Sequence, residues 1–181
     1  MPSNTALAVG PNITYYVVKT YNPYTYLPVT VSAYFNPKAE SLALEDYQAG
    51  DKLIPYRKVG EFKGPELEGI RYEQLMPWMR PEGDAFRVIL GDYVSTEDGT
   101  GIVHIAPTFG ADDYRVAKAA GVPPLMMIDK DGNRRPMVDM TGKFYLLEDL
   151  DPEFVQTRMN AADYDPFQGK FVKNAYDPEK T

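Results

Sequence analysis

The residues best suited to acid–base or ionic chemistry gather in one stretch of the chain, GTGIVHIAPTFGADDY at positions 99–114. This stretch holds His104, the only histidine among the 181 residues, and the adjacent acids Asp112 and Asp113 follow within nine positions. An imidazole can carry or lose a proton near neutral pH, and a carboxylate can hold a cationic amine through a charge-assisted hydrogen bond. The residue types therefore indicate a site for a small cationic ligand, provided that the fold brings the two side chains together.

Each of these residues also has an ordinary structural interpretation. In an alternating strand His104 shares a face with Ile102 and Ala106, and because both faces are largely apolar the strand is expected to be central, with the histidine a satisfied core residue. An acid in the first turn of a helix suits the helix dipole and the free N–H groups, which accounts for Asp113. The strand end, the short loop containing proline and the helix N-terminus nevertheless place His104 and Asp113 at the same rim.

The elements that must position these residues are mostly strands. Tyrosine and phenylalanine, at 14 and 8 residues, favour strands, and 16 prolines interrupt them. Apolar and alternating runs predict strands at several places. They are residues 13–35 (a pair around a turn at 22–28), 52–62, 69–74, 86–95, 101–107 and the closing segment from 169.

Helical patterns are fewer. Residues 111–121 have acids in their first turn and Gly121 where a C-terminal cap belongs, and residues 147–162 have Pro152 in the first turn. Residues 40–51 predict a short helix or turn, and 125–140 a hairpin around Asp131 and Gly132. Since no repeat or long linker divides the chain, we expect one mixed α/β, strand-rich domain over residues 1–181. Its core should be an antiparallel or mixed β-barrel-like sheet with two or three peripheral helices.

Composition restricts the function classes. The net charge of −7 argues against a protein that grips duplex nucleic acid along its length, although a local basic patch could hold the end of a strand. The chain has no cysteine, and therefore no disulfide or thiolate metal site. It has no apolar run of membrane-spanning length, and the opening MPSNTALAVGPN lacks the parts of a signal peptide. These features predict a cytoplasmic protein with no membrane partner.

Common binding and catalytic motifs fail on spacing. A calcium loop requires three oxygen ligands at alternating positions, then Gly, then Glu six places later; in IDKDGN the acids come too early and position 138 is Val138. The GTG triplet lacks the lysine of a phosphate loop, and no serine nucleophile elbow is present. With one histidine and no cysteine, a zinc site is not expected.

The stretch at 99–114 resembles the signature of the editing domain of isoleucyl-tRNA synthetases, a GTG strand followed by V-H-x-A-P and then F-G-x-x-D. Three further segments are similar to that inserted domain in the same order: PSNTALAVGPN at 2–12, FKGPELEGIRYE at 62–73 and GKFVKNA at 169–175. The valyl and leucyl editing domains share the fold and the GTG strand but have other residues in place of His104. The resemblance therefore covers essentially the whole chain and favours the isoleucyl form.

The resemblance implies the class I synthetase editing-domain fold and hydrolysis of the ester of mischarged valyl-tRNA(Ile). It implies that Asp113 holds the α-ammonium group of valine and that His104 forms the wall that rejects isoleucine, without acting as a general base. Asn4 and Phe109 match pocket positions of the family. No cofactor or metal is implied in this segment, because ATP and magnesium serve the ligation site of the parent enzyme.

The same resemblance implies partners and a boundary. The partners are the 3′ aminoacyl end of tRNA(Ile) and the remainder of the synthetase chain, with the segment itself a monomer. The H-I-G-H and K-M-S-K-S type motifs of the ligation site are absent, and the family's T-T-x-P-W-T-L strand would stand just before Pro2-Ser3-Asn4. We therefore expect an excised insertion whose threonine-rich strand is truncated. Two alternatives stay open: an editing domain of a valyl or leucyl synthetase, and a non-catalytic binding module that presents tyrosines on one sheet.

Overall fold

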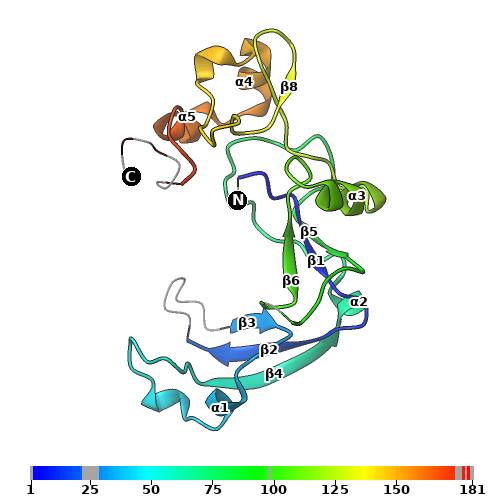
Figure 1. Cartoon of the computed structure of the whole chain (residues 1–181), viewed down its shortest axis with the longest axis vertical. Coiled ribbons are helices and arrows are strands. Elements are labelled where there is room, and N and C mark those ends of the chain that lie inside the picture. The colour runs from blue at the N-terminus through cyan, green and yellow to red at the C-terminus, as the bar shows by residue number, and fades with distance from the viewer. Residues whose placement is uncertain (1, 22–28, 98, 174–176, 178, 180–181) are drawn as a thin grey trace. The chain divides into compact units, whose positions relative to one another are not determined.

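The computed structural model describes residues 2–21, 29–97, 99–173, 177 and 179 (Figure 1). Its contacts divide the chain into two compact units, and each unit is made of segments that are distant in the sequence. The first unit comprises Met1–Ala6, Arg71–Arg87 and His104–Thr181, and the second comprises Leu7–Ile70 and Val88–Val103. All four residues of the candidate site belong to the first unit.

The second unit contains an antiparallel sheet of order β3-β2-β4. Its strands are β2 (Thr14–Thr20), β3 (Val29–Ser32) and β4 (Tyr56–Lys63), with a register shift between Val17 and Val18 where β2 meets β4. The strand pair predicted within 13–35 and the strand predicted at 52–62 are confirmed, while the predicted turn at 22–28 lies outside the described residues. Two short helices, α1 (Pro37–Glu40) and α2 (Gly64–Leu67), and a 3₁₀ turn at Leu44–Asp46 follow the strands.

Tyr15 of β2 anchors the core of this unit. Its side chain is fully buried, and its hydroxyl donates to the carbonyl of Gly101 at 2.6 Å and accepts from the N–H of Gly10 at 2.8 Å. Gly101 has a φ of 73°, and a Cβ there would lie 2.7 Å from the Cβ of Ala33. The second glycine of the GTG triplet is therefore required by backbone conformation and by a close approach, not by ligand chemistry.

A further sheet has the order β5-β1-β6, with β1 (Ala6–Val9) in the middle and β5 (Arg87–Leu90) and β6 (Ile102–Ile105) on its two sides (Figure 1). The expectation that the strand carrying His104 is central is therefore wrong. The central strand is β1, in which Ala6, Ala8 and Val9 are buried and Leu7 is partly buried. The apolar residues of β6 are explained by one buried position, Ile105, and by partial burial of Ile102 and Val103.

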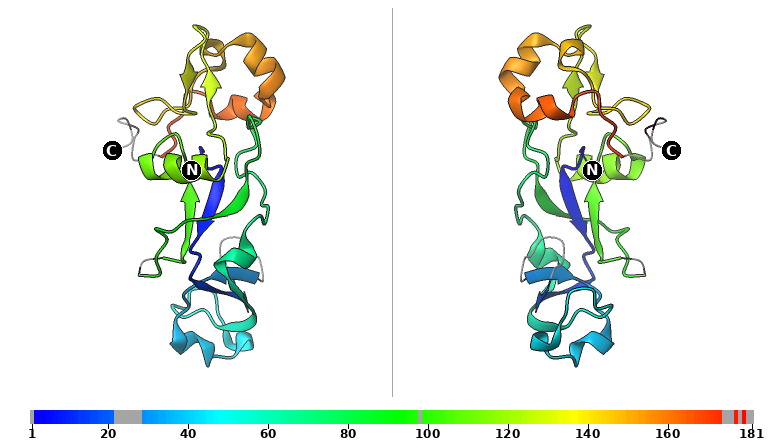
Figure 2. Two further views of the ribbon diagram at one scale, coloured as in Figure 1. Left: turned by 90° about the vertical axis from the view of Figure 1, so that its right-hand side faces the viewer. Right: turned by 90° about the vertical axis from the view of Figure 1, so that its left-hand side faces the viewer.

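The first unit holds the remaining helices and an aromatic core to which α4 and α5 contribute. Trp78, the only tryptophan of the chain, packs edge-on against Phe144 and Tyr164, with ring centroids 5.3 and 5.5 Å away. The elements of this unit are α3 (Ala111–Ala119), β7 (Met127–Ile128), β8 (Arg134–Arg135), η2 (Leu147–Asp149), α4 (Pro152–Arg158), α5 (Ala161–Tyr164) and η3 (Asp165–Phe167). Figure 2 shows the hairpin and α4 side by side.

The two predicted helices are confirmed, but the second of them, at 147–162, is divided into shorter elements. Helix α3 ends before Gly121, whose φ is 69°. The segment 147–162 forms η2, α4 and the start of α5, because Asp151 caps α4 through Phe154 N–H at 2.7 Å and Met159 is extended. Within the part of the chain described, none of the helices has the length and apolar character needed to cross a membrane.

The overall class, a mixed α/β and strand-rich fold, is confirmed. The sheets of the described residues contain three, three and two strands and do not close into a barrel. The strand predicted at 69–74 is reduced to one bridge between Arg71 and Arg87, and the closing strand to one bridge between Lys143 and Phe171. Gly69, with a φ of 83°, turns the chain where the first of these strands was expected.

Two turns of the first unit share one design. In each, an aspartate Oδ1 accepts the N–H groups two and four residues ahead, and a glycine with positive φ follows at the third position. Asp129 and Gly132 form the first turn, and Asp139 and Gly142 the second. The hairpin predicted around Asp131 and Gly132 is confirmed, and the oxygens of Asp129 are used by its own turn.

We predict that Asp129→Asn destabilises the first unit. The bond from Arg135 at 2.8 Å, with the turn N–H groups, lowers the pKa of Asp129 from 3.8 to about 2. The stabilisation should therefore be complete above pH 3.8 and be lost as the pH falls through about 2. Urea unfolding monitored by Trp78 fluorescence between pH 2 and 7 measures the free energy of unfolding. This free energy should fall at low pH in the wild type and lose that pH dependence in Asp129→Asn.

Asp131→Asn is the matched control, because Asp131 is exposed and only its backbone N–H bonds within this turn. Equal unfolding midpoints for the two variants at pH 7 would contradict the role given to Asp129.

Candidate functional site

The site begins at the junction between β6 and α3. Asp113 is the third residue of α3, and its Oδ2 accepts the N–H of Ala106 at 2.9 Å. The intervening loop is closed by the N–H of Phe109, which donates to the carbonyl of Ala106 at 3.0 Å. The carboxylate of Asp113 therefore lies beside the backbone two residues after His104, which supports the prediction that both residues occupy one rim.

Only one oxygen of Asp113 is used in this way. The carboxylate makes no second hydrogen bond and no ion pair with any residue that the structure describes, and the side chain is partly exposed. The N-cap residue of α3 is Gly110, which has no side chain. A Cβ at that position would lie only 3.3 Å from Cγ of Asp113. The glycine thus leaves room for the carboxylate, whose Oδ1 is available to a cationic group.

The structure corrects the interpretation of His104 as a core residue. Its side chain is exposed, whereas the next residue, Ile105, is fully buried. No hydrogen bond, ion pair or ring contact joins the side chain of His104 to another described residue. An imidazole without protein partners at the edge of a sheet is free to contact a ligand, so the geometry favours the functional interpretation.

Asn4 differs from this pattern because its amide is fully engaged within the protein. Nδ2 donates to the carbonyl of Ala6 at 2.8 Å and more weakly to that of Ile105 at 3.5 Å. Oδ1 accepts the hydroxyl of Tyr72 at 2.6 Å, and Asn4 is 6% exposed. The side chain therefore fixes the backbone beside His104, through Ile105, instead of presenting free polar atoms to a ligand.

Two residues that the sequence did not indicate complete this support. Burial raises the pKa of Tyr72 to about 12, so its hydroxyl stays protonated and can donate to Asn4 at neutral pH. Phe86 packs edge-on against Tyr72 at 6.1 Å and has a φ of 58°, which is unusual for a bulky residue. Its N–H donates to Thr5 at 2.7 Å and its carbonyl accepts from Tyr72 at 3.0 Å. Only long-range contacts identify these roles, so no local pattern could have revealed them.

Phe109 and Asp112 lie on the outside of the same junction. Phe109 is 51% exposed, so its ring is available to a ligand, as a pocket position requires. Asp112 is more exposed still and has only a long ion pair of 3.9 Å with Arg115. The two adjacent acids thus differ: Asp113 is held by the backbone of the site, and Asp112 faces solvent.

The arrangement offers a carboxylate oxygen, an imidazole and an aromatic ring around one strand end. It suits recognition of a small ammonium-bearing group next to an apolar or aromatic body. Within the described part of the chain, no group of three or more histidine, aspartate or glutamate residues is placed to hold a metal ion.

Comparisons with known proteins identify relatives of this segment. An isoleucine–tRNA ligase of Bacteroides fragilis is 62% identical over 185 residues, which cover 98% of this chain and 16% of that protein. The corresponding ligase of Porphyromonas gingivalis is 57% identical, covering the whole chain and 17% of the relative, and that of Thermoplasma acidophilum is 39% identical over 72% of the chain. No family model matches the chain.

A solved structure, described as the crystal structure of GlLeuRS-CP1, is similar in fold. It has a TM-score of 0.50 and 15% sequence identity, and the match covers 97% of this chain and 69% of that chain. At this identity the likeness concerns the fold alone. The chain spans about one sixth of the length of the curated relatives that it matches.

We predict that Tyr72→Phe lowers the free energy of unfolding by about 1–3 kcal/mol, since Oδ1 of the buried Asn4 loses its donor. Urea unfolding monitored by Trp78 fluorescence measures the effect. Tyr114→Phe removes an equivalent hydroxyl from a residue that is 50% exposed and should change stability little. Equal effects of the two substitutions would show that the buried hydrogen bond does not support the site.

Proposed function

The chain belongs, over the segment that it represents, to the isoleucine–tRNA ligase family, and on that basis we propose that it is the family's editing domain. The reaction is hydrolysis of the ester that joins valine to tRNA(Ile). The observation that carries the proposal is the Asp113 carboxylate, with one oxygen held by Ala106 N–H at 2.9 Å and the other available. That oxygen would accept a hydrogen bond from the α-ammonium group of the mischarged amino acid.

The need for a second site follows from the size of a methylene group. Valine lacks one methylene of isoleucine, and such a difference provides only about 1–3 kcal/mol of discrimination, or roughly 10–200-fold, as isoleucyl enzymes themselves exemplify. A second site that admits valine but excludes isoleucine can remove the wrong product. Discrimination then depends on the two sites together, because each rejects a different amino acid.

His104 is proposed to be the wall that excludes isoleucine. Its side chain has no protein partner, and it stands two residues before the backbone that holds Asp113. An exposed imidazole can therefore limit the room next to a bound ammonium group. Phe109, on the same loop, would pack beside the aminoacyl-adenosine. For Asn4 we propose a positioning role in place of the expected direct contact, and its bonds to Ala6, Ile105 and Tyr72 support that proposal.

The chemistry requires little further apparatus. An aminoacyl ester is already activated, so holding it next to a positioned water molecule can suffice without a covalent intermediate. We propose that this segment uses no cofactor or metal, with ATP and magnesium confined to the ligation site of the parent enzyme. Its partners would be the 3′ aminoacyl end of tRNA(Ile) and the rest of the synthetase chain, in the cytoplasm.

The alternatives receive less support. A tyrosine-faced binding module predicts alternating exposed tyrosines on one sheet, yet Tyr15 of β2 is fully buried and Tyr16 is partly buried. Among the described residues, the exposed tyrosines lie outside the strands: Tyr114 is on α3, and Tyr21, Tyr34 and Tyr93 are in loops. A valyl or leucyl origin is disfavoured because the relatives described above, at 39–62% identity, are isoleucine–tRNA ligases.

We predict that Asp113→Asn in the full-length ligase slows deacylation of valyl-tRNA(Ile) at least about tenfold, because a charge-assisted hydrogen bond to the ammonium group is lost. The asparagine Oδ1 can still accept from Ala106, so the loop should persist. Single-turnover hydrolysis of purified valyl-tRNA(Ile) is the measurement.

Asp112→Asn is the matched control, since this neighbouring carboxylate is exposed and remains outside the site. Deacylation at the parental rate by the Asp113 variant, or an equal loss in the Asp112 variant, would refute the assignment of Asp113.

We predict that His104→Ala admits isoleucine, so that correctly charged isoleucyl-tRNA(Ile) is also hydrolysed. The physical reason is the space left by the imidazole, which a side chain larger by one methylene can then occupy. Hydrolysis of isoleucyl-tRNA(Ile) by the full-length variant is measured beside that of valyl-tRNA(Ile). Continued protection of isoleucyl-tRNA(Ile) would rule out the size-filter role.

A further inference from the structure

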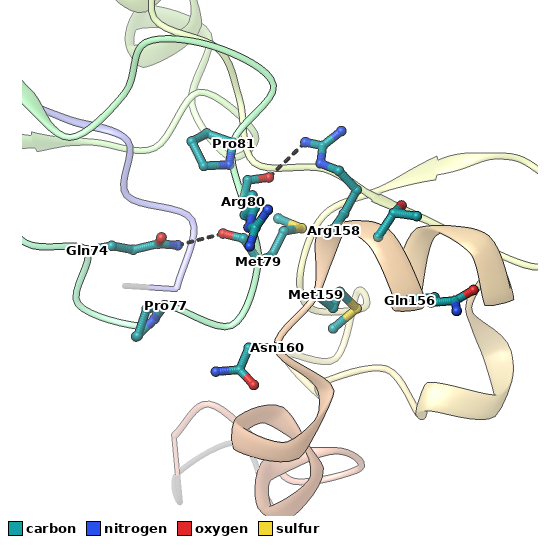
Figure 3. A pocket seen from close by; sticks show the side chains of 10 residues that line it. Gln74, Pro77, Met79, Arg80, Pro81, Gln156, Arg158, Met159 and Asn160 are labelled. Atoms are coloured by element: carbon teal, nitrogen blue, oxygen red, sulfur yellow. Dashed lines mark hydrogen bonds between the residues drawn. The ribbon is translucent and has the colours of Figure 1, made fainter.

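A cavity of about 490 Å³ lies in the first unit, apart from the residues of the candidate site. Two segments, 74–81 and 156–160, provide its walls (Figure 3). The lining contains two arginines and no acidic residue, although the chain as a whole has a net charge of −7. The lining residues are Gln74, Pro77, Met79, Arg80, Pro81, Gln156, Thr157, Arg158, Met159 and Asn160.

The two segments are joined by a short antiparallel ladder. Met79 pairs with Met159, the N–H of Arg80 donates to the carbonyl of Arg158 at 2.9 Å, and that of Asn160 donates to the carbonyl of Trp78 at 2.7 Å. Met79 is 2% exposed and belongs to the core around Trp78. The wall of the cavity is therefore attached to the buried core of this unit through Met79.

Side chains reinforce the ladder, as the dashed lines of Figure 3 show. Nη2 of Arg158 donates to the carbonyl of Arg80 at 2.8 Å, and Nε2 of Gln74 donates to the carbonyl of Met79 at 3.1 Å. The backbone of Arg80 is thus fixed at both its N–H and its carbonyl. Its guanidinium group, by contrast, is exposed and has no hydrogen bond or ion pair with any described residue.

The cavity keeps a net positive charge despite two nearby carboxylates, Glu82 and Asp163, the second of which accepts a hydrogen bond from the lining residue Asn160. Glu82 lies 4.0 Å from Arg158, but it also pairs with Arg134 at 2.8 Å. Glu82 is thus shared between two guanidinium groups, and the guanidinium of Arg80 adds a third positive charge that has no partner among the described residues, so three positive charges stand against the two carboxylates. Like charges gathered at a cavity favour an anionic ligand, and the guanidinium fork matches phosphate oxygens in geometry.

The remaining lining restricts the ligand further. The volume falls in the range of about 300–1,000 Å³ that is typical of small-molecule sites, which suits a nucleotide but not a duplex. Pro77 and the partly exposed Met159 offer apolar surface for a base, and the amide of Gln156 forms no hydrogen bond with the described residues. The amide of Asn160 is engaged, since Nδ2 donates to Asp163 at 2.5 Å.

We propose that this cavity binds a nucleotide of a single-stranded RNA segment, with its phosphate on Arg80 and Arg158. The proposal rests on the proposed function in one respect, because that function makes RNA the partner of this chain. The residues of this proposal differ from those of the editing proposal, since neither His104 nor Asp113 lines the cavity. RNA is favoured over an acidic peptide because apolar surface and a free amide accompany the two guanidinium groups.

The test is fluorescence anisotropy of the 181-residue chain with a labelled eight-nucleotide single-stranded RNA, at 50 and 200 mM salt. We expect Arg80→Gln to weaken binding about tenfold and to reduce the slope of log affinity against log salt by about 0.7, the value for one phosphate contact on a single strand. Lys170→Gln removes one charge at an exposed position of the same unit and should leave binding unchanged.

Competitors identify the ligand chemistry. Adenosine monophosphate that displaces the labelled RNA supports a single nucleotide pocket, and displacement by unlabelled RNA alone supports a longer strand. Displacement by an acidic octapeptide but not by unlabelled RNA would overturn the proposal in favour of a protein partner. Equal affinity of Arg80→Gln and wild type, with unchanged Trp78 fluorescence, would also overturn it.

This outcome is separable from that of the editing proposal. The RNA measurement involves no hydrolysis and uses Arg80 variants, whereas the editing test measures deacylation by Asp113 variants of the full-length ligase. Deacylation could be lost in Asp113→Asn while Arg80→Gln keeps the RNA affinity of the wild type. That result would leave the editing assignment standing and would remove only the proposed role of the cavity.

Discussion

The candidate site depends on one hydrogen bond, from the N–H of Ala106 to Oδ2 of Asp113 at 2.9 Å. The bond ties the first turn of α3 to the end of β6, and therefore holds Asp113 beside the strand that carries His104. It satisfies the N–H of Ala106, which directly follows the last residue of β6 and so lies outside the strand. The same carboxylate thus stabilises the loop and presents its second oxygen outward, so structure and recognition share one side chain.

The backbone on the other side of the site is held by a buried polar cluster. Asn4 connects the N-terminal segment to Ile105, Tyr72 supplies the donor for its oxygen, and Phe86 packs on Tyr72 in a left-handed conformation. A buried amide without these partners would be costly, so the cluster specifies one arrangement of the chain. The positive φ of Phe86 is a local strain that the bonds to Thr5 and Tyr72 maintain.

Charge is distributed unevenly between the two places that we propose to contact the substrate. At the candidate site the available group is a carboxylate, which suits the ammonium end of an aminoacyl ester. At the cavity beside Arg80 and Arg158 the available groups are guanidiniums, which suit the phosphates of the attached RNA. A chain with a net charge of −7 can thus serve an RNA substrate, because local charges at short range decide recognition.

Local features of the structure were determined by the sequence alone. The hairpin around Asp131 and Gly132, the extent of α3 and the proline at the start of α4 follow from turn chemistry and helix periodicity, which act over a few residues. The motif at 99–114 likewise indicated Asp113 and His104. Tertiary structure alone decided that β1 is the central strand, that β6 lies beside it at the edge, and that His104 is exposed. It also decided that Tyr72 completes Asn4 and that two arginines share a cavity, because these depend on pairings between segments far apart in the sequence, which no local pattern encodes.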